Sequence, residues 1–142
     1  MGLFNSLRKS EESKEMKIID KDIGFAQDCF NLIKNLIAME THCLNSYLSS
    51  KDEKWLKLMK EFREKRTFYL DKITSKNNGN GWCISKHLAE SSMLLQELST
   101  RYMTIDDLEN AKRCAEDSGF YYEKFLEING YLDRKAENKT SA

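Results

Sequence analysis

The sequence predicts one all-α domain, an antiparallel up-down-up-down four-helix bundle. Two observations predict this fold: four segments carry apolar residues at spacings of three and four, and the 142 residues include no proline. The connections between the segments are short, which makes sequential helices antiparallel neighbours. We expect the bundle to span residues 22–132, between mobile polar tails at residues 1–21 and 133–142.

The first helix is expected from about residue 22 to 49, and the second from about Ser50 to Thr74. A capping box, Ser50-x-x-Glu53, predicts the start of the second helix directly after a tight turn. The apolar stripe of the first helix comprises Phe25, Cys29, Leu32, Ile33, Leu36, Ile37, Cys43, Leu44 and Tyr47. The stripe of the second comprises Trp55, Leu58, Met59, Phe62, Tyr69, Leu70 and Ile73.

Residues 75–81, with the sequence SKNNGNG, form the strongest break in the chain. Asn and Gly tolerate positive φ angles and end helices. A third helix is expected over residues 82–103. The spacing Thr104-x-x-Asp107 then supplies a capping signal for a fourth helix over residues 105–132.

Composition limits the classes of partner. Basic and acidic residues number 23 each, so no net charge attracts nucleic acid or anionic lipid. No apolar run approaches the roughly 18 residues of a transmembrane helix. The absence of a signal peptide and of any C-x-x-C pair predicts a cytoplasmic protein with reduced cysteines. Among Cys29, Cys43, Cys83 and Cys114, the candidate reactive thiol is Cys83, beside the predicted turn.

The N-terminus carries a short lipidation pattern. Its first six residues fit M-G-x-x-x-[ST], with Gly2 as the acceptor for a myristoyl group. The apolar cluster of Leu3, Phe4 and Leu7 could dock weakly on a membrane surface. A tail without either role is the alternative that this stretch leaves open.

Two charged residues lie at the centres of apolar stripes. On a helix, residues three, four and seven positions apart share a face, and all six such neighbours of Glu40 are apolar or aromatic. Five of the six around Arg66 are also apolar or aromatic. Because burial of an unpaired carboxylate is costly, Glu40 requires a partner. The sequence therefore predicts a buried ion pair between Glu40 and Arg66.

Ser91 and Ser118 occupy the corresponding stripe centres of the third and fourth helices. With a rise of about 1.5 Å per residue, all four polar residues fall about 15–21 Å from the same end of the bundle. We expect them to form one polar layer.

Two interpretations of this layer remain open. In the first, the ion pair is purely structural, fixes the helix register and is completed by the two serines. In the second, the layer is a small-ligand site in which Arg66 recognises a carboxylate or phosphate. The candidate ligand-binding residues are Glu40, Arg66, Ser91, Ser118, His87, Tyr122 and Tyr47.

The sequence offers no motif for catalysis. Di-iron bundles need E-x-x-H on two helices, whereas His42 follows Glu40 by only two residues and His87 precedes Glu90. Neither serine lies in a G-x-S-x-G elbow. We therefore predict no catalytic residue, no metal and no cofactor.

Three large aromatic residues fall outside the predicted core faces: Phe68, Trp82 and Phe120. Together they could belong to a homodimer or partner interface. The sequence thus favours a non-catalytic protein–protein interaction module, self-associating or binding another protein. A ligand-binding or enzymatic bundle that uses the polar layer is the alternative.

Overall fold

The computed structural model describes residues 22–75 and 79–132. The predicted all-α fold is confirmed, and the described residues contain no strand. The four helices are α2 (Ile23–Ser50), α3 (Lys54–Ile73), α4 (Gly81–Thr104) and α5 (Leu108–Ile128). The predicted tails, the acceptor Gly2 and the apolar cluster of Leu3, Phe4 and Leu7 lie outside the described residues.

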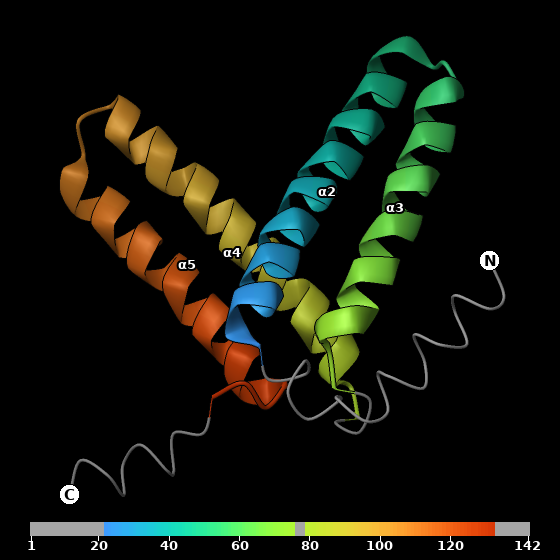
Figure 1. Ribbon diagram of the computed structural model, residues 1–142. Helices are drawn as coiled ribbons and strands as arrows, with labels where there is room; N and C mark the ends of the chain where they lie inside the picture. The colour runs from blue at the N-terminus through green and yellow to red at the C-terminus, as the bar shows by residue number, and fades with distance from the viewer. Residues whose placement is uncertain (1–21, 76–78, 133–142) are drawn as a thin grey trace, which may run out of the picture.

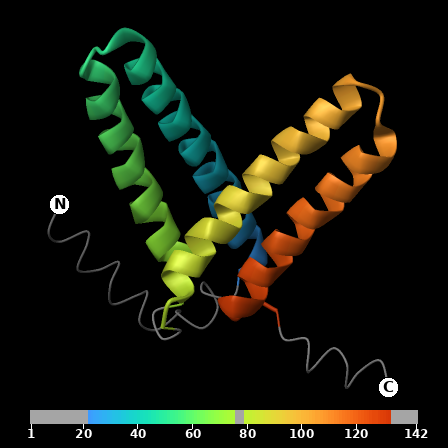
Figure 2. The same cartoon turned by 180° about the vertical axis from the view of Figure 1, so that it is seen from behind.

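The four helices are arranged as two antiparallel hairpins, α2 with α3 and α4 with α5 (Figure 1). Packing is extensive within each hairpin and much sparser between them. The two hairpins cross at a common base and diverge from it as the arms of a V, as the view from behind also shows (Figure 2). Sequential helices are therefore antiparallel, as predicted, but the arms do not run side by side to their tips.

The hydrophobic core lies where the hairpins cross. Phe30 of α2 is buried against two rings of α5, with ring centroids 4.9 Å from Phe125 and 5.0 Å from Tyr122. Beyond α5, Tyr131 stacks on Phe125 and donates its hydroxyl to the carbonyl oxygen of Ile73 at 3.0 Å. These contacts join both hairpins at the base.

The side chain of Asn129 forms hydrogen bonds to three segments at this base. This residue follows α5, which ends at Ile128 rather than near residue 132 as predicted. Its amide nitrogen donates to Ser85 Oγ and to the Phe125 carbonyl, both at 2.9 Å, and its amide oxygen accepts from Ser75 N at 2.9 Å. Buried amides need such partners, and this one is satisfied by α4, α5 and the segment that follows α3.

The predicted capping box between the first two helices is wrong. Ser50 is the last residue of α2, and its hydroxyl donates back to the Ser46 carbonyl at 2.7 Å. The chain turns at Lys51, which adopts a left-handed φ of 57°. The N-cap of α3 is Glu53, whose side chain makes no capping hydrogen bond; the free backbone nitrogen of Lys54 donates instead to Asp52 Oδ1 at 3.0 Å.

The fourth helix begins at Leu108, three residues later than predicted. Its N-cap is Asp107, whose carboxylate accepts from the backbone nitrogen of Asn110 at 3.1 Å and from its side-chain nitrogen at 2.7 Å. These hydrogen bonds lower the pKa of Asp107. Thr104 is not a cap: it ends α4, and its hydroxyl bonds the Thr100 carbonyl. Among the described helices, none is long and apolar enough to cross a bilayer.

Candidate functional site

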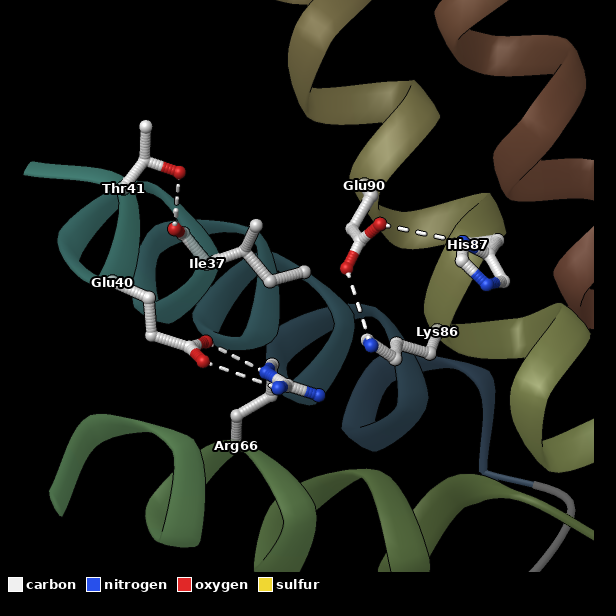
Figure 3. A network of polar contacts seen from close by, with 7 residues as sticks. All are labelled: Ile37, Glu40, Thr41, Arg66, Lys86, His87 and Glu90. Atoms are coloured by element: carbon white, nitrogen blue, oxygen red, sulfur yellow. Dashed lines mark hydrogen bonds and ion pairs between the residues drawn. The ribbon is translucent and has the colours of Figure 1, made fainter. Parts of the chain in front are cut away.

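The predicted ion pair between Glu40 and Arg66 is confirmed. Arg66 Nε donates to Oε2 of Glu40 at 2.6 Å, and Nη2 donates to Oε1 at 3.1 Å (Figure 3). Both residues are more than nine-tenths buried between α2 and α3. Because each carboxylate oxygen already accepts a charge-assisted hydrogen bond, the pair is closed on itself.

The second polar pair differs from the prediction in one residue. Ser118 of α5 faces Ser92, not Ser91, across the second hairpin. The two hydroxyls lie 3.0 Å apart, and each also donates to the other residue's carbonyl oxygen, at 3.2 Å from Ser92 and 2.9 Å from Ser118. Ser91 is half-buried on the neighbouring side of α4. The sequence does indicate Ser92, because small residues repeat at helical spacing through this position.

That spacing defines the face that α4 turns toward α5. Its buried residues are Ser85, Ala89, Ser92 and Ser99, all small and separated by three, four or seven positions. Ser99 Oγ donates to the carbonyl oxygen of Ala111 at 2.8 Å, one more side-chain contact with the main chain of α5. Small side chains at a contact let two helix axes approach closely.

The two polar pairs do not form the predicted single layer. Glu40 and Arg66 lie in the α2–α3 arm, whereas Ser92 and Ser118 lie in the α4–α5 arm, and the arms diverge (Figure 1). Within the described residues, no hydrogen bond links one pair to the other.

The remaining candidate ligand-binding residues are dispersed. His87 is solvent-exposed rather than at the flank of a buried stripe, and its Nδ1 lies 3.4 Å from Glu90, which also contacts Lys86 (Figure 3). Tyr47 is half-buried on α2 near its C-terminal end. The hydroxyl of Tyr122 is buried without a hydrogen-bond partner in the described part of the chain. Burial and the nearby charge of Asp28 raise the pKa of Tyr122.

A stripe of large apolar side chains follows the outward side of α4. The α4 stripe consists of the exposed Ile84, Leu94, Leu98 and Ile105 and the half-buried Leu88, Ser91, Leu95 and Tyr102. Ile84, Ser91, Leu98 and Ile105 repeat every seven residues, which is the heptad spacing of a coiled-coil seam. Seen from behind, α4 crosses in front of α2 (Figure 2). The sequence predicts that this face of the third helix is buried; Leu88 does pack against the core, but Ile84, Leu94 and Leu98 face solvent.

The exposed aromatics agree with the prediction at two positions of three. Phe68 and Phe120 are about half exposed. Trp82 is not free: it packs against the core at the base, and its indole nitrogen donates to Asp71 at 2.6 Å. Lys72 and Lys124 lie over the exposed rings, which reduces the apolar character of those two positions.

A polar groove of about 430 Å³ opens where α2 and α4 part. Lys34 Nζ spans it and donates to Gln96 Oε1 at 3.1 Å. Burial lowers the pKa of Lys34. The other lining residues are Asn31, Asn35, Ala38, Met93 and Glu97.

The cysteines are all unpaired thiols. Cys29 and Cys43 are buried, and burial raises the pKa of both, with Asp28 and Glu40 respectively adding to the shift. Cys83 is exposed and Cys114 is half-buried.

Within residues 22–75 and 79–132, no three His, Cys, Asp or Glu side chains are grouped to hold a metal ion.

No family model, curated protein or solved structure matches this chain.

Proposed function

We propose that this chain is a non-catalytic protein–protein interaction module that binds its partner through the α4 stripe. The observation that carries the proposal is the orientation of α4, which turns Ile84, Leu94 and Leu98 toward solvent. Leu94, Leu98 and Ile105 are exposed to 53%, 45% and 70%. Single exposed apolar residues are normal on proteins, but a continuous helical stripe of them is typical of an interaction site.

The two faces of α4 are the reverse of those expected for a monomeric soluble helix. Such a helix buries its largest apolar residues and exposes its small polar ones. In α4, Ser92 and Ser99 are buried, while Leu94 and Leu98 are exposed. A partner that covers the stripe would bury these leucines and remove their apolar area from water.

The mode of recognition that fits best is helix against helix. Heptad-spaced apolar residues on one helix insert between those of a facing helix, as in coiled coils. We place this interaction in a reducing, cytoplasmic setting, which is supported by the unpaired thiols of Cys29, Cys43, Cys83 and Cys114.

The alternative, a ligand-binding or enzymatic bundle, receives less support from the contacts. A ligand at Glu40 and Arg66 would have to replace two charge-assisted hydrogen bonds that the pair already makes. The serine pair likewise saturates its own hydroxyls. In both pairs the groups that face each other are already hydrogen-bonded, whereas a preformed site directs its polar groups into an open cavity.

Site-specific photocrosslinking tests the proposal. A photoreactive phenylalanine analogue replaces Leu94 on the stripe or, as a matched control, the equally exposed Phe120 on α5, in the full chain expressed in its native host. We expect protein adducts from position 94 and few from position 120. Equal yields from both positions would contradict an interaction surface on α4.

A further inference from the structure

We infer that the partner of the α4 stripe is a second copy of this chain, whose α4 packs antiparallel to the first. The inference rests on the proposed interaction function and specifies its partner. The observation behind it is the distribution of apolar and charged residues along α4, which is complementary to itself when one copy is reversed.

Two pairs of apolar residues in the stripe are symmetric about one point, which lies between Leu94 and Leu95. Ile84 and Ile105 lie at equal distances from the midpoint between Leu94 and Leu95. A two-fold axis through this midpoint would place Ile84 of one copy opposite Ile105 of the other. The two central leucines would then contact their counterparts, which gives the exposed Leu94 a matching apolar partner.

The charges beside the stripe favour the antiparallel over the parallel arrangement. Glu90 and Arg101 lie along the same edge of the stripe, on opposite sides of its midpoint. In an antiparallel pair, Glu90 of one copy lies within two residues, about 3 Å along the axis, of Arg101 of the other. The symmetry produces this attraction twice. A parallel pair would instead place the edges that carry Glu90 and Arg101 on opposite sides of the seam, where these charges do not meet.

The overall charge also permits self-association. The chain has 23 basic and 23 acidic residues, so two copies do not repel each other through their net charge near neutral pH. A seam of three heptads on each copy, from Ile84 to Ile105, has about 31 Å of contact length.

Sedimentation velocity of the purified full chain tests the inference. From micromolar to near-millimolar concentration, the wild type is expected to pass from monomer to dimer. Leu94→Glu should weaken dimerisation about tenfold or more, because it places a charge in the apolar seam. The matched control, Phe120→Glu, adds the same charge at an equally exposed site off the stripe and should dimerise like the wild type. Circular dichroism verifies that both variants retain their helices.

Charge reversal tests the antiparallel arrangement. Glu90→Arg and Arg101→Glu should each weaken the homodimer, since each creates two like-charge contacts. An equimolar mixture of these two variants should recover association, because both contacts in the mixed dimer are then between Arg and Glu. Loss of dimer in the single variants without recovery in the mixture would overturn the antiparallel register.

A wild type that remains monomeric at all concentrations would overturn the second copy as the partner. Photocrosslinks from position 94 to a different protein would in that case leave the proposed interaction function standing. A dimer that Leu94→Glu does not weaken would show that the copies associate through another surface and would overturn the inference as well.

Discussion

Ser92 and Ser118 each donate a hydrogen bond to the other's carbonyl oxygen, across the contact between α4 and α5. The reciprocal bonds, at 3.2 and 2.9 Å, tie the side chain of each helix to the main chain of its neighbour. Because Ser92 is almost completely buried, these bonds replace hydrogen bonds to water that the hydroxyl would otherwise lose. The pair therefore fixes both the spacing and the register of this hairpin.

We expect two substitutions of Ser92 to separate the effect of its hydrogen bonds from the effect of its small size. Ser92→Ala removes the hydroxyl but leaves room for α5, so it should lower the free energy of unfolding by about 1 kcal/mol. Ser92→Leu should cost about 1–3 kcal/mol or more, because it forces the helix axes apart. Urea unfolding followed by circular dichroism measures both, with Ser91→Ala on the outward side of α4 as the control. A Ser92→Leu protein as stable as the wild type would contradict close packing.

The ion pair of Glu40 and Arg66 should show strong coupling in a double-mutant cycle. Glu40→Gln or Arg66→Met alone should destabilise the protein by about 3–5 kcal/mol, because each leaves a buried charge without its counter-ion. The double variant should be less destabilised than the sum of the two, since neither charge remains. Chemical denaturation of the four proteins gives the coupling energy. A value near zero would mean that the pair does not act as a unit.

The same pair shows what the sequence can predict. Glu40 and Arg66 are each surrounded on their helix face by large apolar residues, so burial and the need for a counter-ion follow from the spacing alone. Their depth along adjacent antiparallel helices then leaves few alternative partners.

The orientation of α4 could not be predicted in the same way. Ile84, Leu94 and Leu98 give α4 its strongest apolar periodicity, which normally marks the face that packs on the core of the same chain. In α4 these residues are exposed, so periodicity alone predicts the wrong orientation. The face that packs on α5 consists mainly of Ser and Ala. The transfer free energies of these residues are too small to produce an apolar periodicity in the sequence. Close approach of the helices and hydrogen bonds to the main chain, as at Ser92 and Ser99, decide the packing instead.

The helix starts were misplaced for a local reason. Ser50, Asp52 and Glu53 lie within four positions, and any Ser or Asp there can accept a bond from a free backbone nitrogen. The left-handed turn at Lys51 decides that Asp52 does so. The position of such a turn depends on how the two helices pack, which the local sequence does not encode.

Removal of the Tyr122 hydroxyl should stabilise the protein. This oxygen is buried without a partner in the described part of the chain, whereas the ring packs on Phe30. Tyr122→Phe keeps the ring contact and should raise the free energy of unfolding by about 1 kcal/mol. The control is Tyr131→Phe, which loses a hydrogen bond to the Ile73 carbonyl and should be destabilised. A destabilised Tyr122→Phe protein would show that the hydroxyl is hydrogen-bonded.

The N-cap Asp107 should contribute a pH-dependent stabilisation. Hydrogen bonds from Asn110 lower the pKa of Asp107 below its ordinary 3.8, so the carboxylate favours the folded state. This contribution is complete above the ordinary pKa and is lost as the pH falls through the lower folded value. The melting temperatures of wild type and Asp107→Ala should therefore differ near neutral pH and converge in strong acid. Asp117→Ala, an exposed acid within α5, is the control and should show a smaller difference at neutral pH.

Replacing the small polar residue within the α4 stripe, Ser91, by an apolar one should strengthen self-association. Ser91 is the one small polar residue among the stripe's heptad positions, between Ile84 and Leu98. Ser91→Leu would complete the seam and should lower the dimer Kd about tenfold, because a leucine is removed from water in each copy. Thr100→Leu makes a comparable change on an exposed part of α4 outside the stripe and should leave the Kd unchanged. Sedimentation velocity compares the two, and an equal gain from both would indicate non-specific association of a more apolar helix rather than a seam that includes Ser91.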